Sequence, residues 1–223
     1  MLAACAGKEA PARASDAYVQ QVFDALAERF DENLRRLQYR APQLAIEALA
    51  ASAGAPRQEL DVLDAGCGTG LCGPLLRSYA RRLTGVDLSN GMVAKARGLG
   101  VYDELVVAEL TAYLGAQPRA FDVVVSADTL VYFGDLGPVF TACAAALRAG
   151  GLLLFTVESA DLDDETPQAG YRLNPTGRYN HHEVYLRDEL AAAGFSVASI
   201  AAAALRQEGG QPVPGYVATA RNR

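Results

Sequence analysis

Three alternating glycines that directly follow a short apolar segment constrain this chain more than any other feature. Residues Val62–Gly70 read Val-Leu-Asp-Ala-Gly-Cys-Gly-Thr-Gly, which predicts a buried strand that turns sharply into a helix. Glycines accept positive φ and let a ligand approach where a Cβ would collide, and the following helix offers unpaired N–H groups. Asp87 ends the next apolar segment, where the next strand of an open α/β sheet would bring it close to ribose hydroxyls. The sequence therefore predicts a site for an adenosine-containing cofactor.

The glycines fit two cofactor patterns. Gly66, Gly68 and Gly70 form G-x-G-x-G, whereas Gly68, Gly70 and Gly73 form the G-x-G-x-x-G pattern of dinucleotide binding. The dinucleotide pattern places its first glycine at the end of the strand, and from Gly66, which stands there, only the alternating pattern fits. Asp64 would repel a pyrophosphate but attract the ammonium group of S-adenosylmethionine. We therefore predict S-adenosylmethionine as cofactor, with a nicotinamide dinucleotide as the alternative.

Four motifs resemble those of the class I S-adenosylmethionine-dependent methyltransferases. Leu63–Gly70 resembles their first motif, and Gly85–Ser89 resembles their second. Phe121–Val125 is similar to the motif of the fourth strand, and Leu147–Gly151 to the turn before the fifth, with Ala149 where a proline is more usual.

The resemblance covers roughly residues 15–222 and implies an α/β fold. Its elements are a doubly wound, mostly parallel seven-stranded sheet (Rossmann-like), a C-terminal antiparallel hairpin and an N-terminal helical lid. Tyr39–Pro42, Leu71–Pro74 and Gly177–Tyr179 further resemble the methyltransferase domain of bacterial tetratricopeptide-repeat-associated methyltransferases, whose substrates are mostly unassigned.

The chain is expected to fold as three parts: a flexible tail over residues 1–14, the helical lid over 15–56 and the S-adenosylmethionine-binding methyltransferase domain over 57–223. Ser15 can cap a helix that runs to about Leu37 with one apolar stripe. Pro42 suits the first turn of a second helix that runs to about Ser52.

Beyond the lid, predicted strands alternate with predicted helices. We expect strands at 61–64, 83–86, 104–107, 121–126 and 152–157, and helices at 71–80, 90–97, 136–148 and 182–193. The alternation predicts a parallel sheet with helices on both faces. Phe195–Arg206 and Val213–Ala220 flank a turn and predict the antiparallel hairpin, which argues against an ordinary dinucleotide dehydrogenase.

Cofactor-binding residues are expected at the ends of the first four strands. Asp87 should accept hydrogen bonds from the ribose hydroxyls, while Asp64 and the Gly66 carbonyl should face the methionine ammonium. By resemblance to the family, Glu109 should accept from the adenine amino group. Asp64 as a buried structural acceptor and Glu109 as a solvated side chain stay open. The full predicted set is Tyr39, Asp64, Ala65, Gly66, Cys67, Gly68, Gly70, Asp87, Leu88, Met92, Glu109, Leu110 and Ala127.

Three side chains are candidates for a catalytic role. Asp128 can bind a substrate amine, act as a base or cap a turn, and Tyr132 can line the pocket or pack in the core. His181 could deprotonate a hydroxyl or amine at neutral pH. Five acids within 158–165 predict either a solvated loop or a mouth that attracts a cationic substrate.

Composition narrows the class of partner and compartment. Twenty basic and 26 acidic residues give a net charge of −6 without a long basic run, which disfavours nucleic acid. No stretch approaches the roughly 20 apolar residues that span a bilayer. Four cysteines without a C-x-x-C pair favour reduced thiols in the cytoplasm and no metal site.

The sequence thus predicts a cytoplasmic S-adenosylmethionine-dependent methyltransferase that acts by direct displacement on a small-molecule or protein acceptor. Two alternatives stay open: a nicotinamide-dependent oxidoreductase, and a catalytically inactive cofactor-binding platform. The sequence specifies neither the acceptor, nor the use of a general base, nor the oligomeric state.

Overall fold

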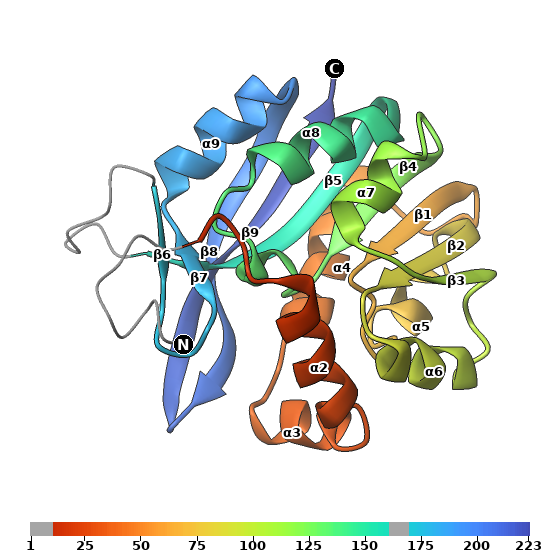
Figure 1. The fold of residues 1–223 in the computed structure, drawn as a ribbon. Helices are drawn as coiled ribbons and strands as arrows, with labels where there is room; N and C mark the ends of the chain where they lie inside the picture. Colours follow the sequence, from red (N-terminus) through yellow and green to blue (C-terminus); the bar gives the residue numbers. More distant parts are fainter. Residues whose placement is uncertain (1–10, 161–169) are drawn as a thin grey trace.

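The computed structural model describes residues 11–160 and 170–223, which contain one sheet of nine strands, seven of them in the order β3-β2-β1-β4-β5-β9-β8 (Figure 1). The parallel strands are β1 (Leu60–Ala65), β2 (Ala80–Asp87), β3 (Glu104–Val107), β4 (Phe121–Ser126) and β5 (Leu147–Ser159). β8 (Phe195–Glu208) and β9 (Gln211–Asn222) form a hairpin that adds to β5 in antiparallel orientation. The predicted fold, including the C-terminal hairpin, is confirmed.

Helices cover both faces of this sheet because successive apolar side chains of a strand point to opposite sides. Val124 of β4 joins the core beneath α7 (Leu110–Gly115), α8 (Gly137–Ala146) and α9 (Glu183–Ala192). Val123 and Val125 join the second core, which α4 (Ala41–Ala53) and α5 (Gly73–Leu76) cover. α6 (Asn90–Gly98) packs against β2 and β3.

Several elements differ from the sequence-based expectation. The helix expected up to Leu37 is two helices, α2 (Asp16–Leu26) and α3 (Phe30–Arg36), and α5 is a single turn. Two short strands, β6 (Tyr171–Leu173) and β7 (Tyr179–His181), pair with each other, and β7 also pairs with the end of β5. α7 and a 3₁₀ turn, η1 (Leu130–Tyr132), were not expected either, because elements of three to six residues carry too little periodicity.

Residues 11–14, expected in a flexible tail, are bonded to the segment around η1. The Ala12 carbonyl accepts from the N–H groups of Gly134 and Asp135, each at 2.8 Å, and the Pro11 carbonyl accepts from the Tyr179 hydroxyl at 2.7 Å. Residues 1–10 of the expected tail lie outside the described residues.

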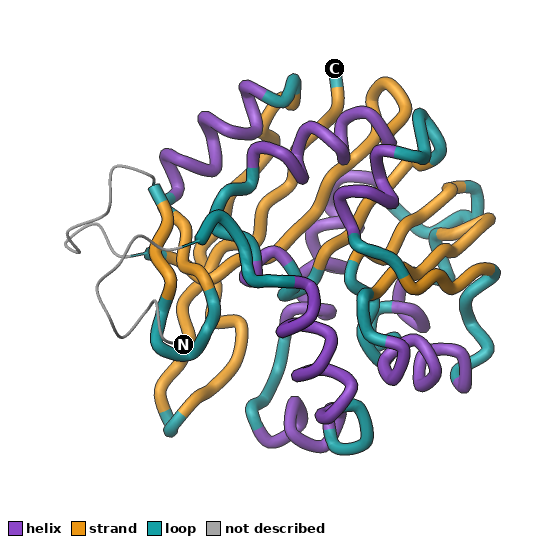
Figure 2. The backbone as a smooth tube through the Cα atoms, in the orientation of Figure 1, coloured by secondary structure: helices purple, strands orange, loops and turns teal. Residues whose placement is uncertain are grey.

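The lid helices α2 and α3 stand apart from the layered sheet, at the edge to which the carboxyl ends of the parallel strands point (Figures 1 and 2). Polar contacts dock them there. Asp24 accepts from the Gly91 N–H at 3.0 Å and from the Ser89 hydroxyl, both at the start of α6, and Asp31 accepts from the Thr69 hydroxyl at 2.5 Å. Among the described residues, no helix is long and apolar enough to cross a bilayer.

Candidate active site

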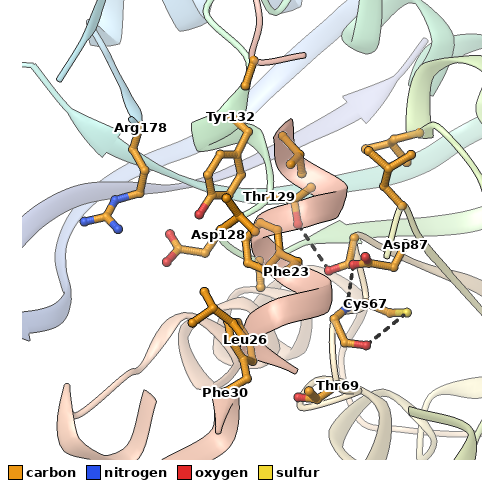
Figure 3. Close-up of a pocket in the computed structure, with 18 of the residues that line it drawn as sticks. Phe23, Leu26, Phe30, Cys67, Thr69, Asp87, Asp128, Thr129, Tyr132 and Arg178 are labelled. Atoms are coloured by element: carbon orange, nitrogen blue, oxygen red, sulfur yellow. Dashed lines mark hydrogen bonds between the residues drawn. The ribbon is translucent and has the colours of Figure 1, made fainter. Parts of the chain in front are cut away.

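A cavity of about 410 Å³ lies between the lid and the carboxyl ends of β1, β2 and β4 (Figure 3). It brings together eleven of the residues predicted from the sequence: Tyr39, Gly66, Cys67, Gly68, Asp87, Leu88, Glu109, Leu110, Ala127, Asp128 and Tyr132. Figure 3 shows Asp87, Cys67 and Thr69 on one side of the view and Asp128 and Arg178 on the other, with Phe23 between them. The cavity therefore has two chemically different ends.

The end near β1 and β2 combines a glycine loop with a carboxylate. Gly66 has φ +78°, and a Cβ there would lie 2.0 Å from Thr129 Oγ1, so a side chain cannot fit. Gly68 has φ +54° and donates its N–H to Asp87 Oδ2 at 2.9 Å, while Asp87 Oδ1 accepts from the Ser89 N–H at 2.9 Å. Burial raises the pKa of Asp87. The loop backbone and the Asp87 carboxylate thus form one hydrogen-bonded unit that borders the cavity.

Glu109 is partly exposed, but its carboxylate is fully engaged in contacts with the protein. It is the N-cap of α7, where its carboxylate accepts from the N–H groups of Thr111 at 2.9 Å and Ala112 at 2.7 Å. Arg13 donates to the same carboxylate at 2.7 Å. Burial alone would raise the pKa of Glu109, but these contacts outweigh it and lower the pKa. Glu109 therefore fixes both α7 and the strap over residues 11–14, while it borders the cavity.

Asp64, Ala65, Gly70 and Met92 are predicted cofactor residues that do not line the cavity. Asp64 is 1% exposed and accepts from the Tyr102 hydroxyl at 2.6 Å, and burial raises its pKa to about 7. Met92 is fully buried, and Gly70 packs against Leu99 and Tyr102. The placement of Asp64 matches the alternative of a buried structural acceptor, because Tyr102 occupies the side of β1 toward which the carboxylate points.

His181 also lies away from the cavity, which corrects its prediction as a catalytic base. The imidazole is completely buried in β7, its Nε2 lies 3.1 Å from the Gly134 carbonyl oxygen, and its ring stacks on Tyr185. Burial lowers its pKa to about 4. The long connection after β5 does reach the cavity, but through Thr176 and Arg178.

The opposite end of the cavity holds a cluster of five charged side chains, the acceptor-end cluster: Asp128, Glu158, Arg178, Arg206 and Glu208. Arg206 Nη1 lies 3.1 Å from Asp128 Oδ2 and its Nε lies 2.8 Å from Glu208 Oε1, while Nη2 contacts Glu158. Arg178 contacts Glu158 at 2.6 Å and Glu208 at 2.5 Å. The cluster joins β4, β5, the β6–β7 turn and the hairpin, and three of its members, Asp128, Arg178 and Arg206, line the cavity.

Asp128 occupies an unusual position within this cluster. Its φ is +59°, a left-handed conformation that is uncommon for residues other than glycine, and its N–H donates to Thr156 Oγ1 at 2.9 Å. Its Oδ1 is buried and has no hydrogen-bond partner in the described part of the chain. Burial raises the pKa of Asp128 to about 6, although Arg206 acts in the opposite direction.

The lid supplies an apolar wall to the cavity. Val19, Val22, Phe23 and Leu26 of α2 line it, and none of the residues of α2 is fully buried. Phe23 meets Tyr132 edge-on with ring centroids 5.3 Å apart. The apolar stripe of the lid therefore faces the cavity rather than the protein core.

Arg206 and Glu208 were not among the site residues predicted from the sequence. A signal was present in the sequence, because Arg206 is the first charged residue after sixteen uncharged ones, Leu190–Leu205. In the structure its side chain is 3% exposed. A buried arginine requires a carboxylate partner. Of the five acids over 158–165 that predicted a solvated loop or an acidic mouth, Glu158 lies in the described part of the chain, where it is buried and ion-paired. The other four lie outside the described residues.

No group of His, Cys, Asp and Glu side chains within residues 11–160 and 170–223 is arranged to hold a metal ion. Cys67, Cys72 and Cys143 are free and buried.

Part of the chain is similar to a known family of proteins. Residues 63–155 match the family model described as a methyltransferase domain. The chain is 37% identical to human methyltransferase-like protein 27 over 143 residues, which are 61% of this chain and 56% of that protein. It is 35% identical to the ubiquinone biosynthesis O-methyltransferase of Thiobacillus denitrificans over 108 residues, 46% of each chain.

Among solved structures, the chain is similar to the 1,6-didemethyltoxoflavin-N1-methyltransferase of Burkholderia thailandensis, which was solved with S-adenosylhomocysteine bound. The TM-score is 0.69 at 24% identity, over 96% of this chain and 92% of that one. This likeness shows a shared fold.

Residues 63–155, which include the glycine loop and Asp87, thus match a methyltransferase domain, and the chain shares the fold of a methyltransferase solved with S-adenosylhomocysteine. The chain spans about half the length of the two curated relatives named above.

Proposed function

We propose that the protein transfers a methyl group from S-adenosylmethionine to a small-molecule acceptor. The observation that carries this proposal is that the Gly66–Asp87 unit and the acceptor-end cluster border the same cavity. Its volume is at the lower end of the range for ligand sites, about 300–1,000 Å³, and the lid is docked over it. A small molecule suits this enclosure better than a side chain presented by a protein, the other acceptor class that the sequence allows.

The residues of the glycine loop fit this cofactor. S-adenosylmethionine supplies, when bound, an electrophilic methyl group on a sulfonium. Gly66 and Gly68 would let its methionine part approach the backbone, and Asp87 would accept from the ribose hydroxyls. Leu88 and Leu110 offer apolar surface for the adenine.

The remaining work of this chain is positioning and exclusion of water. The lid, with Phe23 and Tyr132 edge-on, covers the cavity, and orientation within a dry site can lower a barrier by roughly 7–11 kcal/mol. Asp128 would take the proton of the acceptor.

A nicotinamide-dependent oxidoreductase fits less well. Its glycine pattern needs Gly73, but Gly73 lies in α5, where a Cβ would meet Tyr102 at 2.7 Å, and it does not line the cavity. That glycine therefore serves helix packing. The closer resemblance to tetratricopeptide-repeat-associated methyltransferases is likewise proposed, and the complete gene would test it by the presence of upstream repeats.

The experiment is a transfer assay. Purified protein is incubated with S-adenosylmethionine labelled in the methyl group and a metabolite extract of the source organism, and labelled small molecules are separated from the cofactor. Labelled product that disappears in the Asp87→Ala variant supports the proposal. A protein that binds S-adenosylhomocysteine but labels nothing would instead be the inactive platform.

A further inference from the structure

The acceptor-end cluster restricts the chemical class of the acceptor, an inference that rests on the function proposed above. Within the described residues, two guanidinium groups of the cluster face three carboxylates. Arg206 contacts Asp128, Glu158 and Glu208, and its side chain is 3% exposed. Arg178 contacts Glu158 and Glu208. Both cations of the cluster are therefore already engaged by acids of the protein.

A carboxylate on the acceptor would meet an unfavourable environment here. It would add a fourth negative charge to a cluster that holds three carboxylates and two guanidinium groups, and bonding to an arginine atom that already contacts Glu158 or Glu208 would displace that acid. Displacement of Glu158, whose side chain is 6% exposed, would leave a buried acid without its partner, which is strongly destabilising. The cluster thus selects against an anionic nucleophile.

Asp128, in contrast, favours a hydrogen-bond donor on the methyl acceptor. Its Oδ2 is held by Arg206, while its buried Oδ1 lacks a hydrogen-bond partner in the described part of the chain. A buried oxygen without a hydrogen-bond donor is costly in free energy. A hydrogen-bond donor on the methyl-accepting molecule would satisfy it. The Thr156 hydroxyl and Arg206 hold Asp128 in its left-handed backbone conformation, so the carboxylate is fixed at the border of the cavity.

The other residues that line this end of the cavity indicate the chemistry of the remainder of the methyl acceptor. Phe23, Leu37, Tyr39 and Tyr132 surround this end with apolar and aromatic surface. An acceptor that fills this space is small and mainly apolar.

We infer that the methyl acceptor is a small, mainly apolar molecule whose nucleophile is a hydroxyl oxygen or an amine nitrogen that carries a hydrogen. Free carboxylates are not methylated. The nucleophilic oxygen or nitrogen bonds to the methyl carbon while the carbon–sulfur bond breaks. The electron pair of the broken bond stays on sulfur. The proton of the acceptor passes to the Asp128 carboxylate. The product is an ether or a methylamine, not an ester.

The chemistry of the labelled product tests this inference. Mild alkali releases methanol from a methyl ester, whereas ethers and methylamines keep their methyl group. We expect the label of the isolated small-molecule product to stay non-volatile after alkali. Volatile labelled methanol from most of the product would overturn the inference and leave the proposed function intact. Absence of any labelled small molecule would instead overturn the proposed function, and the inference with it.

A pair of variants tests the part of Asp128. Asp128→Asn should reduce label transfer at least about 100-fold, as expected for loss of a proton acceptor, with S-adenosylhomocysteine affinity changed by no more than about twofold. Asp188→Asn, an exposed change of the same kind on α9, should alter neither. Full transfer by a folded Asp128→Asn variant would overturn the role of Asp128, and the alkali assay on the unaltered protein needs no variant at all.

Discussion

Asp87 and Asp128 are partly buried carboxylates at the ends of two strands, and their neighbours give them different chemistry. Asp87 is surrounded by backbone donors, the N–H groups of Gly68 and Ser89, so it is placed to keep accepting hydrogen bonds. Asp128 is surrounded by charged side chains and has one oxygen without a partner among the described residues. The first suits a binding role, and the second suits proton transfer.

Substitution of Asp87 should weaken cofactor binding. Asp87→Ala removes a charged acceptor, and hydrogen bonds to charged groups contribute about 1.5–3 kcal/mol each, partly offset by water, so we expect a loss of about 2–3 kcal/mol. Titration calorimetry with S-adenosylhomocysteine measures it, with circular dichroism to verify the fold. Unchanged affinity in a folded variant would show that Asp87 only organises the loop.

Methyl transfer should depend on the ionisation of Asp128. Burial raises its pKa to about 6, against the opposing effect of Arg206, while Glu158 and Glu208 add to the rise and Arg178 opposes it. The carboxylate takes a proton only when ionised, so kcat should rise with pH through about 6 and level off above it. A pH profile of transfer checks this, and a profile flat between pH 5 and 8 would contradict it.

At the scale of elements, the lid is held mainly by side chains rather than by a core. Residues of α2 and α3 are at most partly buried, and Asp24, Asp31 and Glu28 tie the lid to Ser89, Thr69 and Lys95. A ligand in the cavity would therefore pack against the apolar stripe of the lid.

Loss of the Asp24 contacts should loosen the lid without unfolding the protein. The Ser89 hydroxyl and the Gly91 N–H lower the pKa of Asp24, so its docking is present above pH ~4 and is lost as pH falls below that value. At neutral pH, Asp24→Asn should increase hydrogen exchange of α2 amides and speed release of S-adenosylhomocysteine. Glu32→Gln, which affects only a pair within α3, is the control. Equal exchange in both variants would contradict this role of Asp24.

The sequence predicted long elements and glycine turns better than side-chain environments. β1, β2 and the hairpin were predictable because apolar runs and glycines mark them. The surroundings of Asp64 and His181 were not predictable because they come from distant segments: Tyr102 is 38 residues from Asp64, and Gly134 is 47 residues from His181. Periodicity carries no information about such partners.

At the scale of the molecule, the topology joins three distant parts of the chain at one cavity. Parallel strands place Asp87 and Asp128 at the same edge, where open α/β sheets bind ligands. The hairpin brings Arg206 to Asp128, 78 residues away in the chain. The lid is tied to that hairpin too, since the Arg40 N–H donates to the Leu205 carbonyl at 2.9 Å and the Gln207 N–H to the Leu37 carbonyl at 2.6 Å.

Calorimetric titration of the purified protein with S-adenosylmethionine, S-adenosylhomocysteine and NAD, each in turn, tests the central claim most directly. The Gly66–Asp87 unit at the mouth of an enclosed cavity predicts binding of both methionine-derived ligands with micromolar Kd, equivalent to about 8 kcal/mol, and no measurable heat with NAD. Tight binding of NAD together with no binding of S-adenosylhomocysteine would contradict the account.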